Sequence, residues 1–358
     1  MKQLKQILAL FLMAVFITAC GGDKESKSSA TDKAPEELKT FNVAWSHYAG
    51  WEPWGYAEHK GIIKKWADKN GIKIKVTLVN DYIESINLYT AGKFDACTMT
   101  NMDALTIPAV GGIDSTGIIV GDFSNGNDAI LMKNASSISD LKGRDVKLVE
   151  FSVSHYLLSR ALDMNGMSEK DIKTINTSDA DIAAIFTADK NGAIVTWNPP
   201  LMQAMKSEGA KIVFDSSKTP GEIIDMMVVK TNAPDSLKKA LAGAWYEVMG
   251  IMNGSDEAAK TEALEFMAKE SGATLDEFKQ QLKTTAMFYT AADATKFTSS
   301  ADIEKTMEHV RKFSFDKGLY GNGAKSADLV GMEFDNGNII GDKNNVKLRF
   351  TSKYMKDQ

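Results

Sequence analysis

The chain has 358 residues, which is enough for two to three globular units. Hydrophobic residues make up 44% of it and charged residues 25%, so the sequence can build buried cores. With 42 basic and 47 acidic side chains the formal net charge is -5, which argues against nucleic acid as a partner. Two cysteines cannot form a disulfide framework, and the four histidines lack metal-ligand spacing. We therefore expect no metal and no other cofactor.

The N-terminus has the pattern of a signal peptide over residues 1–19. Lys2 and Lys5 precede an apolar run at 7–19 that is too short to span a bilayer comfortably. The run ends in Ile-Thr-Ala-Cys, which resembles a bacterial lipobox with Cys20 as the lipid acceptor. An ordinary signal peptide with a chance cysteine is the alternative. Residues 20–40 are polar, so we expect a lipidated, flexible tether that holds the protein outside the cytoplasm, in the periplasm or cell envelope.

The first folded part alternates between strand and helix patterns. β-Branched, alternating runs predict strands, and apolar residues at helical spacing predict helices. In chain order the strands are expected at 41–45, 72–79, 96–99 and 115–120, and the helices at 56–70, 83–91 and 104–109.

Two polar, turn-rich segments, 121–128 and 215–222, divide the rest of the chain. The predicted elements between and after them are strands at 129–132, 146–149, 193–196, 211–214 and 226–230, helices at 154–165 and 180–189, a mostly helical stretch at 234–313 and a Gly/Asn/Asp-rich end at 321–358. This order predicts an α/β fold with two open lobes, two crossings and a ligand cleft between the lobes. The expected boundaries are 41–122 plus 226–358 for one lobe, 128–215 for the other, and hinges near 122–128 and 215–225.

Ligands of such folds bind between lobes, beyond the carboxyl ends of strands. The candidate ligand-binding residues of the first lobe are Trp45, Tyr48, Trp51, Asp81, Tyr82, Asn101 and Asp103. Those of the second lobe are Glu150, Ser152, Ser154, His155, Asp179, Trp197 and Asn198. Structural alternatives are an aromatic packing corner for the tryptophans and helix N-capping for the aspartates. We interpret His155 as an orienting hydrogen-bonding residue, because no nucleophile elbow is present and no catalytic residue is expected.

The charge of these candidates favours a cation over an anion. The predicted strand ends offer several carboxylates, Asp122 among them, and aromatic rings, but neither Arg nor Lys. Carboxylates can bind a small planar cation edge-on through charged hydrogen bonds, while tryptophans contact its face. Guanidinium meets both requirements, and neutral urea meets the hydrogen bonds alone.

Seven segments carry a family resemblance: AWSHYAGWEPWGYAEHKGIIKKWADK (44–69), NDYIESINLYTAGKFDACTMTNMDAL (80–105), VGDFSNGND (120–128), VEFSVSHYLLSRAL (149–162), NTSDADI (176–182), VTWNPP (195–200) and FDSSKTPGEIIDMMVV (214–229). Together they resemble the solute-binding proteins of nitrate/taurine-type ABC importers, and in particular the urea-carboxylase-associated urea/guanidine subgroup. The resemblance implies a type II periplasmic-binding-protein fold, a small-molecule ligand, partner ABC permease subunits with a cytoplasmic ATPase, and a monomer. In the wider family the helix that begins near Ser154 cradles sulfonates, whereas here Glu150 precedes it.

Other functions are compatible with the same pattern. The chain could be a same-fold enzyme of pyrimidine or thiamine-precursor metabolism, a binding protein for a different amine or a sulfonate, or a sensor that partners a membrane receptor. An enzyme would need His and Cys groups converging in the cleft, and Cys97 falls in a predicted buried strand. We therefore expect a transport binding protein and not an enzyme.

Overall fold

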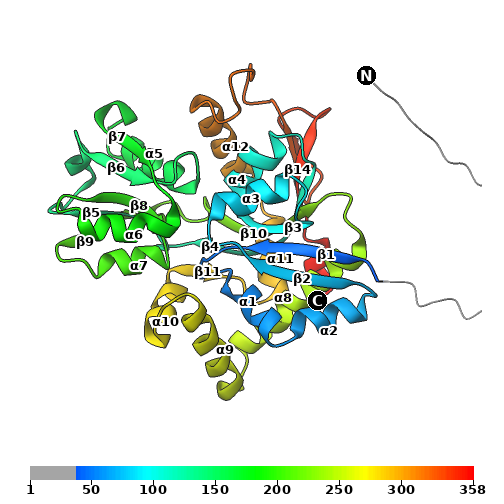
Figure 1. The fold of residues 1–358 in the computed structure, drawn as a ribbon. Helices are drawn as coiled ribbons and strands as arrows, with labels where there is room; N and C mark the ends of the chain where they lie inside the picture. Colours follow the sequence, from blue (N-terminus) through cyan, green and yellow to red (C-terminus); the bar gives the residue numbers. More distant parts are fainter. Residues whose placement is uncertain (1–37) are drawn as a thin grey trace, which may run out of the picture. The chain divides into compact units, whose positions relative to one another are not determined.

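The computed structural model describes residues 38–358, which form one compact unit. The predicted signal peptide, Cys20 and nearly all of the tether lie outside the described residues. The described part contains two β-sheets, each covered by helices, and so forms two α/β lobes (Figure 1). The mixed α/β, two-lobed architecture expected from the sequence is confirmed.

Lobe 1 is built on a nine-stranded sheet within residues 38–358, with the order β13-β12-β14-β4-β10-β3-β1-β2 and β11 paired to β4. Strands β1, β2 and β3 are mutually parallel, whereas β10 runs antiparallel between β3 and β4. The strand bounds are β1 Thr40–Trp45, β2 Lys73–Leu78, β3 Ala96–Thr100, β4 Ser115–Ser124, β10 Ile224–Lys230, β11 Thr285–Met287, β12 Gly331–Glu333, β13 Ile339–Ile340 and β14 Val346–Phe350.

Helices cover both faces of the lobe 1 sheet. The connection from β1 to β2 and the one from β2 to β3 run in opposite directions along the sheet, so right-handed crossovers place their helices on opposite faces. The helices of this lobe are α1 Glu52–His59, α2 Ile62–Lys69, α3 Tyr82–Thr90, α4 Asn101–Ala104, which continues into a π-helical turn at Leu105–Ala109, α8 Asp235–Asn253, α9 Glu257–Glu270, α10 Leu275–Lys283, α11 Ala291–Thr298, α12 Ala301–Asp316 and α13 Lys353–Lys356.

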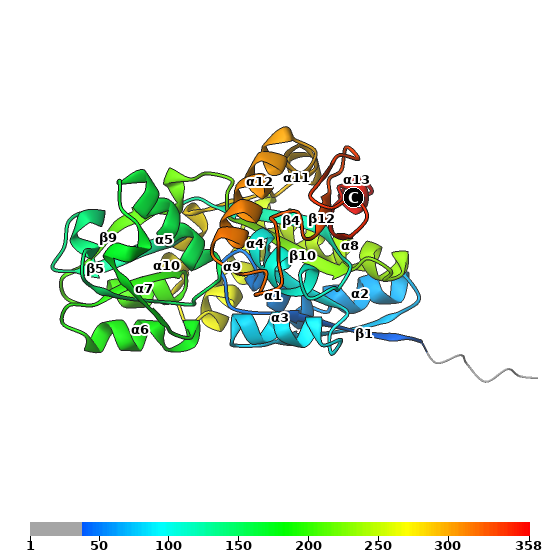
Figure 2. The same cartoon turned by 90° about the horizontal axis from the view of Figure 1, so that it is seen from above.

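Lobe 2 is built on a five-stranded sheet in the order β7-β6-β8-β5-β9. Alternate side chains of β5 point to opposite faces, so Ile130 packs with α5 and Leu131 with α6 and α7. Figure 2 shows α5 and α6 on opposite sides of these strands. The elements are β5 Asp128–Lys133, β6 Asp145–Leu148, α5 Val153–Met164, β7 Lys173–Asn176, α6 Asp179–Ala188, β8 Ala193–Trp197, α7 Pro200–Met205 and β9 Ala210–Asp215, with short 3-10 turns at Ile138–Leu141, Glu169–Asp171 and Ser216–Lys218.

The first chain crossing between the lobes is shorter than the polar sequence indicates. Strand β4 continues through Asp122 to Ser124, and β5 already begins at Asp128, so only residues 125–127 lie outside both sheets. The acidic and glycine residues of this segment look like a turn in the sequence. In the structure β4 pairs with β10, which brings Asp122 opposite Asp225 inside lobe 1.

The helix expected at 56–70 is two helices, α1 and α2. The break falls at Gly61, which has a φ of 70° and therefore adopts the left-handed conformation that glycine tolerates best. This turn lets the apolar faces of both helices pack against α8, in a core that includes Ile63 and Leu241.

Candidate functional site

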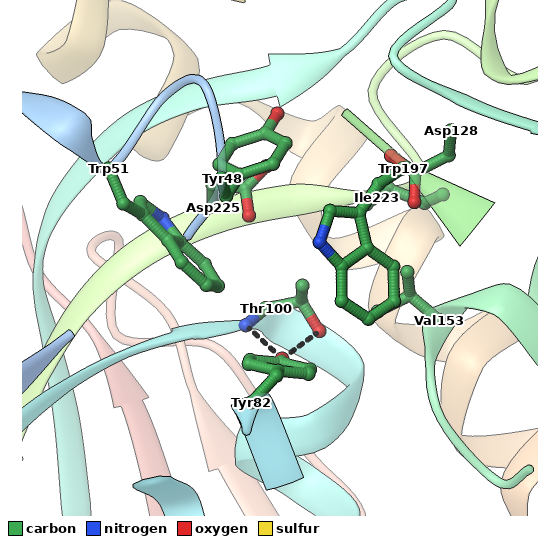
Figure 3. A pocket seen from close by; sticks show the side chains of 9 residues that line it. All are labelled: Tyr48, Trp51, Tyr82, Thr100, Asp128, Val153, Trp197, Ile223 and Asp225. Atoms are coloured by element: carbon green, nitrogen blue, oxygen red, sulfur yellow. Dashed lines mark hydrogen bonds between the residues drawn. The ribbon is translucent and has the colours of Figure 1, made fainter. Parts of the chain in front are cut away.

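A small cavity lies between the two lobes (Figure 3). Its volume is about 20 Å³, on a scale where one water molecule needs roughly 10–15 Å³. The cavity therefore fits a ligand of only a few heavy atoms. Lobe 1 contributes Tyr48, Trp51, Tyr82, Thr100 and Asp225, lobe 2 contributes Asp128, Val153 and Trp197, and Ile223 comes from the second crossing between the lobes.

Four aromatic side chains form most of the cavity wall. Tyr48 and Trp51 lie at the turn between β1 and α1, with ring centroids 5.1 Å apart. Tyr82 opens α3, and its ring centroid is 5.5 Å from that of Trp51 and 5.5 Å from that of Trp197, which ends β8. Figure 3 shows the two indoles on either side of the cavity. Because the faces of aromatic rings carry partial negative charge, such a wall attracts cations.

Two buried carboxyl groups line the cavity, and a third is the strand partner of one of them. Asp128 is the first residue of β5, Asp225 is the second of β10, and Asp122 of β4 is the cross-strand partner of Asp225. The Tyr48 hydroxyl donates a 2.9 Å hydrogen bond to Asp122 Oδ1. The Oδ2 atoms of Asp122 and Asp225 are buried and have no hydrogen-bond partner among the described residues. Unpaired buried acceptors are costly, so they favour a ligand that brings hydrogen-bond donors.

Burial disfavours the charged form of these carboxyl groups. It raises the pKa of Asp122 to about 7, and the pKa of Asp128 to about 7. The pKa of Asp225 lies well above its ordinary value, because burial and the charges of Asp122 and Asp128 act together. None of the described residues that line the cavity is Lys, Arg or His. A bound cation would relieve this electrostatic cost.

A further buried carboxyl, Asp103 of α4, supports the cavity wall from behind. Its Oδ2 accepts a 2.6 Å hydrogen bond from the Tyr82 hydroxyl and a 2.9 Å hydrogen bond from Thr100 Oγ1. Burial raises its pKa to about 6, although these hydrogen bonds and the backbone N–H of Val153 favour the charged form. Its Oδ1 atom has no partner in the described part of the chain. Asp103 thus orients two of the side chains that line the cavity.

The sequence candidates fall into separate groups in the structure. Asp81, Glu150 and Asp179 line a second hollow between the lobes, of about 310 Å³, and not the aromatic cavity. Asp81 caps α3, accepting a hydrogen bond from Glu84 N, and Ser178 Oγ of lobe 2 lies 3.4 Å from its Oδ2. Burial and the nearby Asp81 charge raise the pKa of Asp179 to about 6. This hollow is therefore a second acidic region at the junction of the lobes.

Two of the lobe 1 candidates support the cavity without lining it. Trp45 is the last residue of β1. Its ring packs against Gly55 of α1, where a Cβ atom would approach the ring to 2.7 Å. The Asn101 side chain accepts a 3.1 Å hydrogen bond from Ile224 N and donates one of 3.1 Å to Glu222 O. Asn101 thus holds the chain where it enters β10.

Four lobe 2 candidates lie at helix starts. Ser152 caps α5, and Ser154 in the first turn of that helix has a buried Oγ without a partner among the described residues. His155 Nε2 lies 3.1 Å from Glu169 Oε1, while its Nδ1 accepts a hydrogen bond from Phe151 N. Asn198 accepts a 3.0 Å hydrogen bond from Met202 N at the start of α7. Ser152 and His155 thus order the start of α5, which presents Val153 to the cavity, whereas Asn198 orders the start of α7.

Sequence reasoning missed Asp128 and Asp225 as site residues. Both lie in or beside segments whose polarity indicates a turn, so their carboxylates looked solvated. A signal was present for Asp225: an acid next to the apolar run MMVV is unusual, because an aspartate in a buried strand needs a partner.

Two further observations concern residues 38–358. No group of three or more His, Cys, Asp or Glu side chains there is arranged to hold a metal ion. In the same part of the chain, no helix combines the length and the apolar character needed to cross a membrane.

Two α/β lobes joined by two crossings are the plan of the periplasmic-binding-protein fold, and comparison with solved structures supports this assignment of the fold. The alkanesulfonate-binding protein of Xanthomonas axonopodis pv. citri has a TM-score of 0.64 at 16% identity, covering 80% of this chain and 96% of that chain. The periplasmic nitrate-binding protein of Synechocystis PCC 6803 has a TM-score of 0.56 at 14% identity, covering 89% of this chain and 98% of that one. At these identities the likeness shows the periplasmic-binding-protein fold.

The family follows from the sequence. The profile described as NMT1/THI5 like matches residues 56–239, more than half of the chain, so the chain belongs to the NMT1/THI5-like family. An aliphatic sulfonates-binding protein of Escherichia coli (strain K12), itself assigned by inference, is 32% identical over 81 residues, which is 23% of this chain. The match spans 25% of the length of that relative.

Proposed function

We propose that this protein is the extracytoplasmic solute-binding component of an ABC importer, and that its ligand is guanidinium. The observation that carries the proposal is the cavity itself, where aromatic walls enclose buried carboxyl groups and no basic residue is among the described lining residues. Two of the similar solved structures are named as alkanesulfonate-binding and nitrate-binding proteins, which supports import of a small polar solute. The chemistry of this cavity favours a cation.

Guanidinium matches the cavity in size, shape and hydrogen bonding. It has four heavy atoms in one plane and N–H donors around its edge, as the arginine head group has. Asp225, with its unpaired Oδ2 atom, and Asp128 line the cavity and provide carboxylate acceptors, and Asp122 is the cross-strand partner of Asp225. Trp51 and Trp197 provide ring faces for cation–π contact.

Urea is the second candidate, and one observation favours it. The Nε1 atom of Trp51 is buried without an acceptor among the described residues, and a carbonyl oxygen would satisfy it. Urea also offers two NH₂ groups to the carboxylates, but it leaves their charge uncompensated. A sulfonate or nitrate would add negative charge to a site that already repels it, so both are disfavoured.

The proposal also covers membrane attachment and partner proteins. Export through residues 1–19 and lipid attachment at Cys20 would tether a monomer to the outer face of a membrane, close to permease subunits driven by a cytoplasmic ATPase. Lobes of 41–122 plus 226–358 and of 128–215 would close on the ligand about hinges near 122–128 and 215–225.

A binding role is also favoured over the enzyme alternative by the state of Cys97. Its thiol is buried in β3 beside Ser85, and burial raises its pKa to about 12. A nucleophile needs the thiolate, which this environment suppresses. A sensor and a transport receptor would share the same cavity, and genetic linkage to a permease or to a kinase separates them.

Isothermal titration calorimetry with guanidinium, urea, taurine and nitrate tests the ligand directly. We expect guanidinium to bind most tightly and the two anions not to bind. Tight taurine binding without guanidinium binding would refute the cationic site. Urea binding in preference to guanidinium would replace the ligand while leaving the transport role in place.

A further inference from the structure

Asp122 and Asp225 form a carboxyl pair across two antiparallel strands. They are register partners in β4 and β10, next to a β-bulge, and their exposed fractions are 0% and 2%. Each has an Oδ2 atom without a partner in the described part of the chain. Two carboxylates that share a buried site cannot both ionise easily, so the empty site favours retention of a proton.

The groups around this pair provide no compensating positive charge. Tyr48, before α1, donates to Asp122, and Tyr289, which follows β11, lies near enough to feel the Asp122 charge. Asp128 of β5 adds a third negative group, and Asp103 of α4 acts on Asp128 in turn. None of these neighbours carries a positive charge: the tyrosines are neutral hydrogen-bond donors, and the other groups are carboxyl groups. While the cavity is empty, a proton is therefore the cation that can neutralise the pair.

We propose that Asp122 and Asp225 share one proton in the empty site and that guanidinium displaces it, so that ligand binding is an exchange of a cation for a proton. The O–H bond of the shared carboxyl breaks, its electron pair remains on the Asp oxygen, and the proton leaves to the buffer. The carboxylate thus formed accepts an N–H donor of the ligand. This inference rests on the proposed guanidinium ligand and concerns the regulation of the same site.

The roles of the two residues in the pair differ. Asp122 accepts the 2.9 Å hydrogen bond from Tyr48, which favours its charged form. Tyr48 also favours the charged form of Asp225, but burial, the charges of Asp122 and Asp128 and the hydrogen bond to Asp122 outweigh it and favour the protonated form. Asp225 is therefore the residue that keeps the proton. Asp225 must ionise before it can pair with the cation. Protons therefore compete with guanidinium at low pH, and neutral pH favours guanidinium binding.

The experiment is calorimetry of guanidinium binding to the full chain in buffers of small and large ionisation enthalpy. We expect the observed enthalpy to depend on the buffer, with release of up to about one proton per ligand, and the affinity to fall by up to about tenfold per pH unit as the pH is lowered through the range in which the pair is protonated. In Asp225→Asn the amide still donates to Asp122 but has no proton to lose, so proton release should fall sharply. Asp163→Asn, an exposed site on α5, should leave it unchanged.

Infrared spectroscopy of the ligand-free protein gives a second readout. A protonated carboxyl absorption should be present in the wild type, disappear on addition of guanidinium, and be weakened in Asp225→Asn, or in Asp122→Asn if the first variant fails to fold. Guanidinium binding without buffer dependence would overturn the exchange and leave the guanidinium site intact. Equal proton release from Asp225→Asn would overturn the assignment to this pair. Absence of guanidinium binding at every pH would refute the proposed ligand, and the exchange with it.

Discussion

Asp128 is the carboxyl group that lobe 2 contributes to the cavity. It begins β5, lines the cavity, and approaches Ser124, whose Oγ also accepts a hydrogen bond from the Asp128 backbone N–H. In Asp128→Asn the guanidinium ion loses one charged hydrogen bond, which costs roughly 1.5–3 kcal/mol. We expect calorimetry to show an affinity about ten- to more than a hundredfold lower.

Two controls accompany Asp128→Asn: an uncharged ligand, and the removal of a carboxylate at a different position. Urea carries no charge, so the same substitution should reduce its affinity much less. Glu150→Gln removes a carboxylate from the second hollow, where Glu150 Oε1 lies 2.5 Å from Thr174 Oγ1, and should have a smaller effect on guanidinium. Equal losses in both variants would place the ligand in the acidic hollow and contradict the assignment to the aromatic cavity.

At the residue scale, the sequence predicted which aromatic side chains lie at the cavity better than it predicted which acidic side chains do. Tyr48, Trp51 and Tyr82 follow strands, as the sequence predicts, and Trp197 is the last residue of β8, one position beyond the strand end expected there. The buried acids of β4, β5 and β10 lie within strands, beside turn-forming residues. Local polarity indicates exposure there, and only the pairing of distant strands reveals burial.

The turn between β1 and α1 contacts the carboxyl pair through Gly50. A Cβ atom at this position would clash with Asp122 Oδ2 and approach Tyr48 Cε1 to 2.6 Å. Gly50→Ala should therefore displace both partners of the Tyr48–Asp122 hydrogen bond. We expect calorimetry to show a loss of guanidinium affinity of at least about tenfold, since one buried charged hydrogen bond is at stake.

Gly121→Ala is the control for this prediction, because it makes the same chemical change one residue from Asp122. Its Cβ atom would meet the Trp245 ring of α8 at 2.9 Å, in the core of lobe 1. Thermal melting should show lower stability, while guanidinium affinity should change little. If Gly50→Ala binds guanidinium like the wild type, the Tyr48–Asp122 contact is not needed for binding.

At the element scale, strands with strong alternation were predictable and short or polar ones were not. β1, β2, β8 and β9 lie within a residue or two of the expected ranges. β7 and β11 were missed, because β7 is an edge strand of four residues and β11 is a three-residue strand inside a helical stretch. Such strands are defined by the sheet that they join and not by their own sequence.

The whole molecule should lose stability as the pH rises while the site is empty. Asp103, Asp122 and Asp128 have pKa values raised by burial to about 6, about 7 and about 7. Between the ordinary aspartate pKa of 3.8 and these values the folded state binds more protons than the unfolded state. The free energy of unfolding therefore falls as the pH increases through this window.

The measurement is the melting temperature at about pH 5 and about pH 8, with and without guanidinium at low millimolar concentration. We expect the ligand-free protein to melt lower at the higher pH, and the ligand to raise the melting temperature more at that pH. Glu169 has its pKa lowered to about 2 beside His155 and Lys317, so its contribution is constant across this window. A melting temperature that increases from pH 5 to 8 would contradict the prediction.

Anchoring is a separate property of the whole chain, predicted from residues outside the described part. Cys20→Ser removes the thiol that would receive lipid and should abolish fatty-acid labelling and membrane association in cells. The folded part should be unaffected, so guanidinium affinity of the purified variant should equal that of the wild type. Labelling that persists in Cys20→Ser would show that another group carries the lipid.

The two-lobed plan was predictable because alternating elements and right-handed crossovers leave few ways to arrange a chain of this length. The contacts that join the lobes could not be predicted from the sequence. Arg160 of α5 pairs with Glu222 at 2.9 Å, and Lys317, which follows α12, pairs with Glu169 at 2.7 Å. These pairs join residues about 60 and 150 positions apart, beyond the reach of local patterns.

The aromatic wall gives the protein an optical property. Two of its six tryptophans, Trp51 and Trp197, line the cavity, on opposite lobes. A cation seated against their indole faces, and any change in the separation of the lobes, would alter the surroundings of both fluorophores at once. Ligand binding should therefore be visible as a change in intrinsic tryptophan emission, which would make the unlabelled protein its own sensor for the proposed ligand.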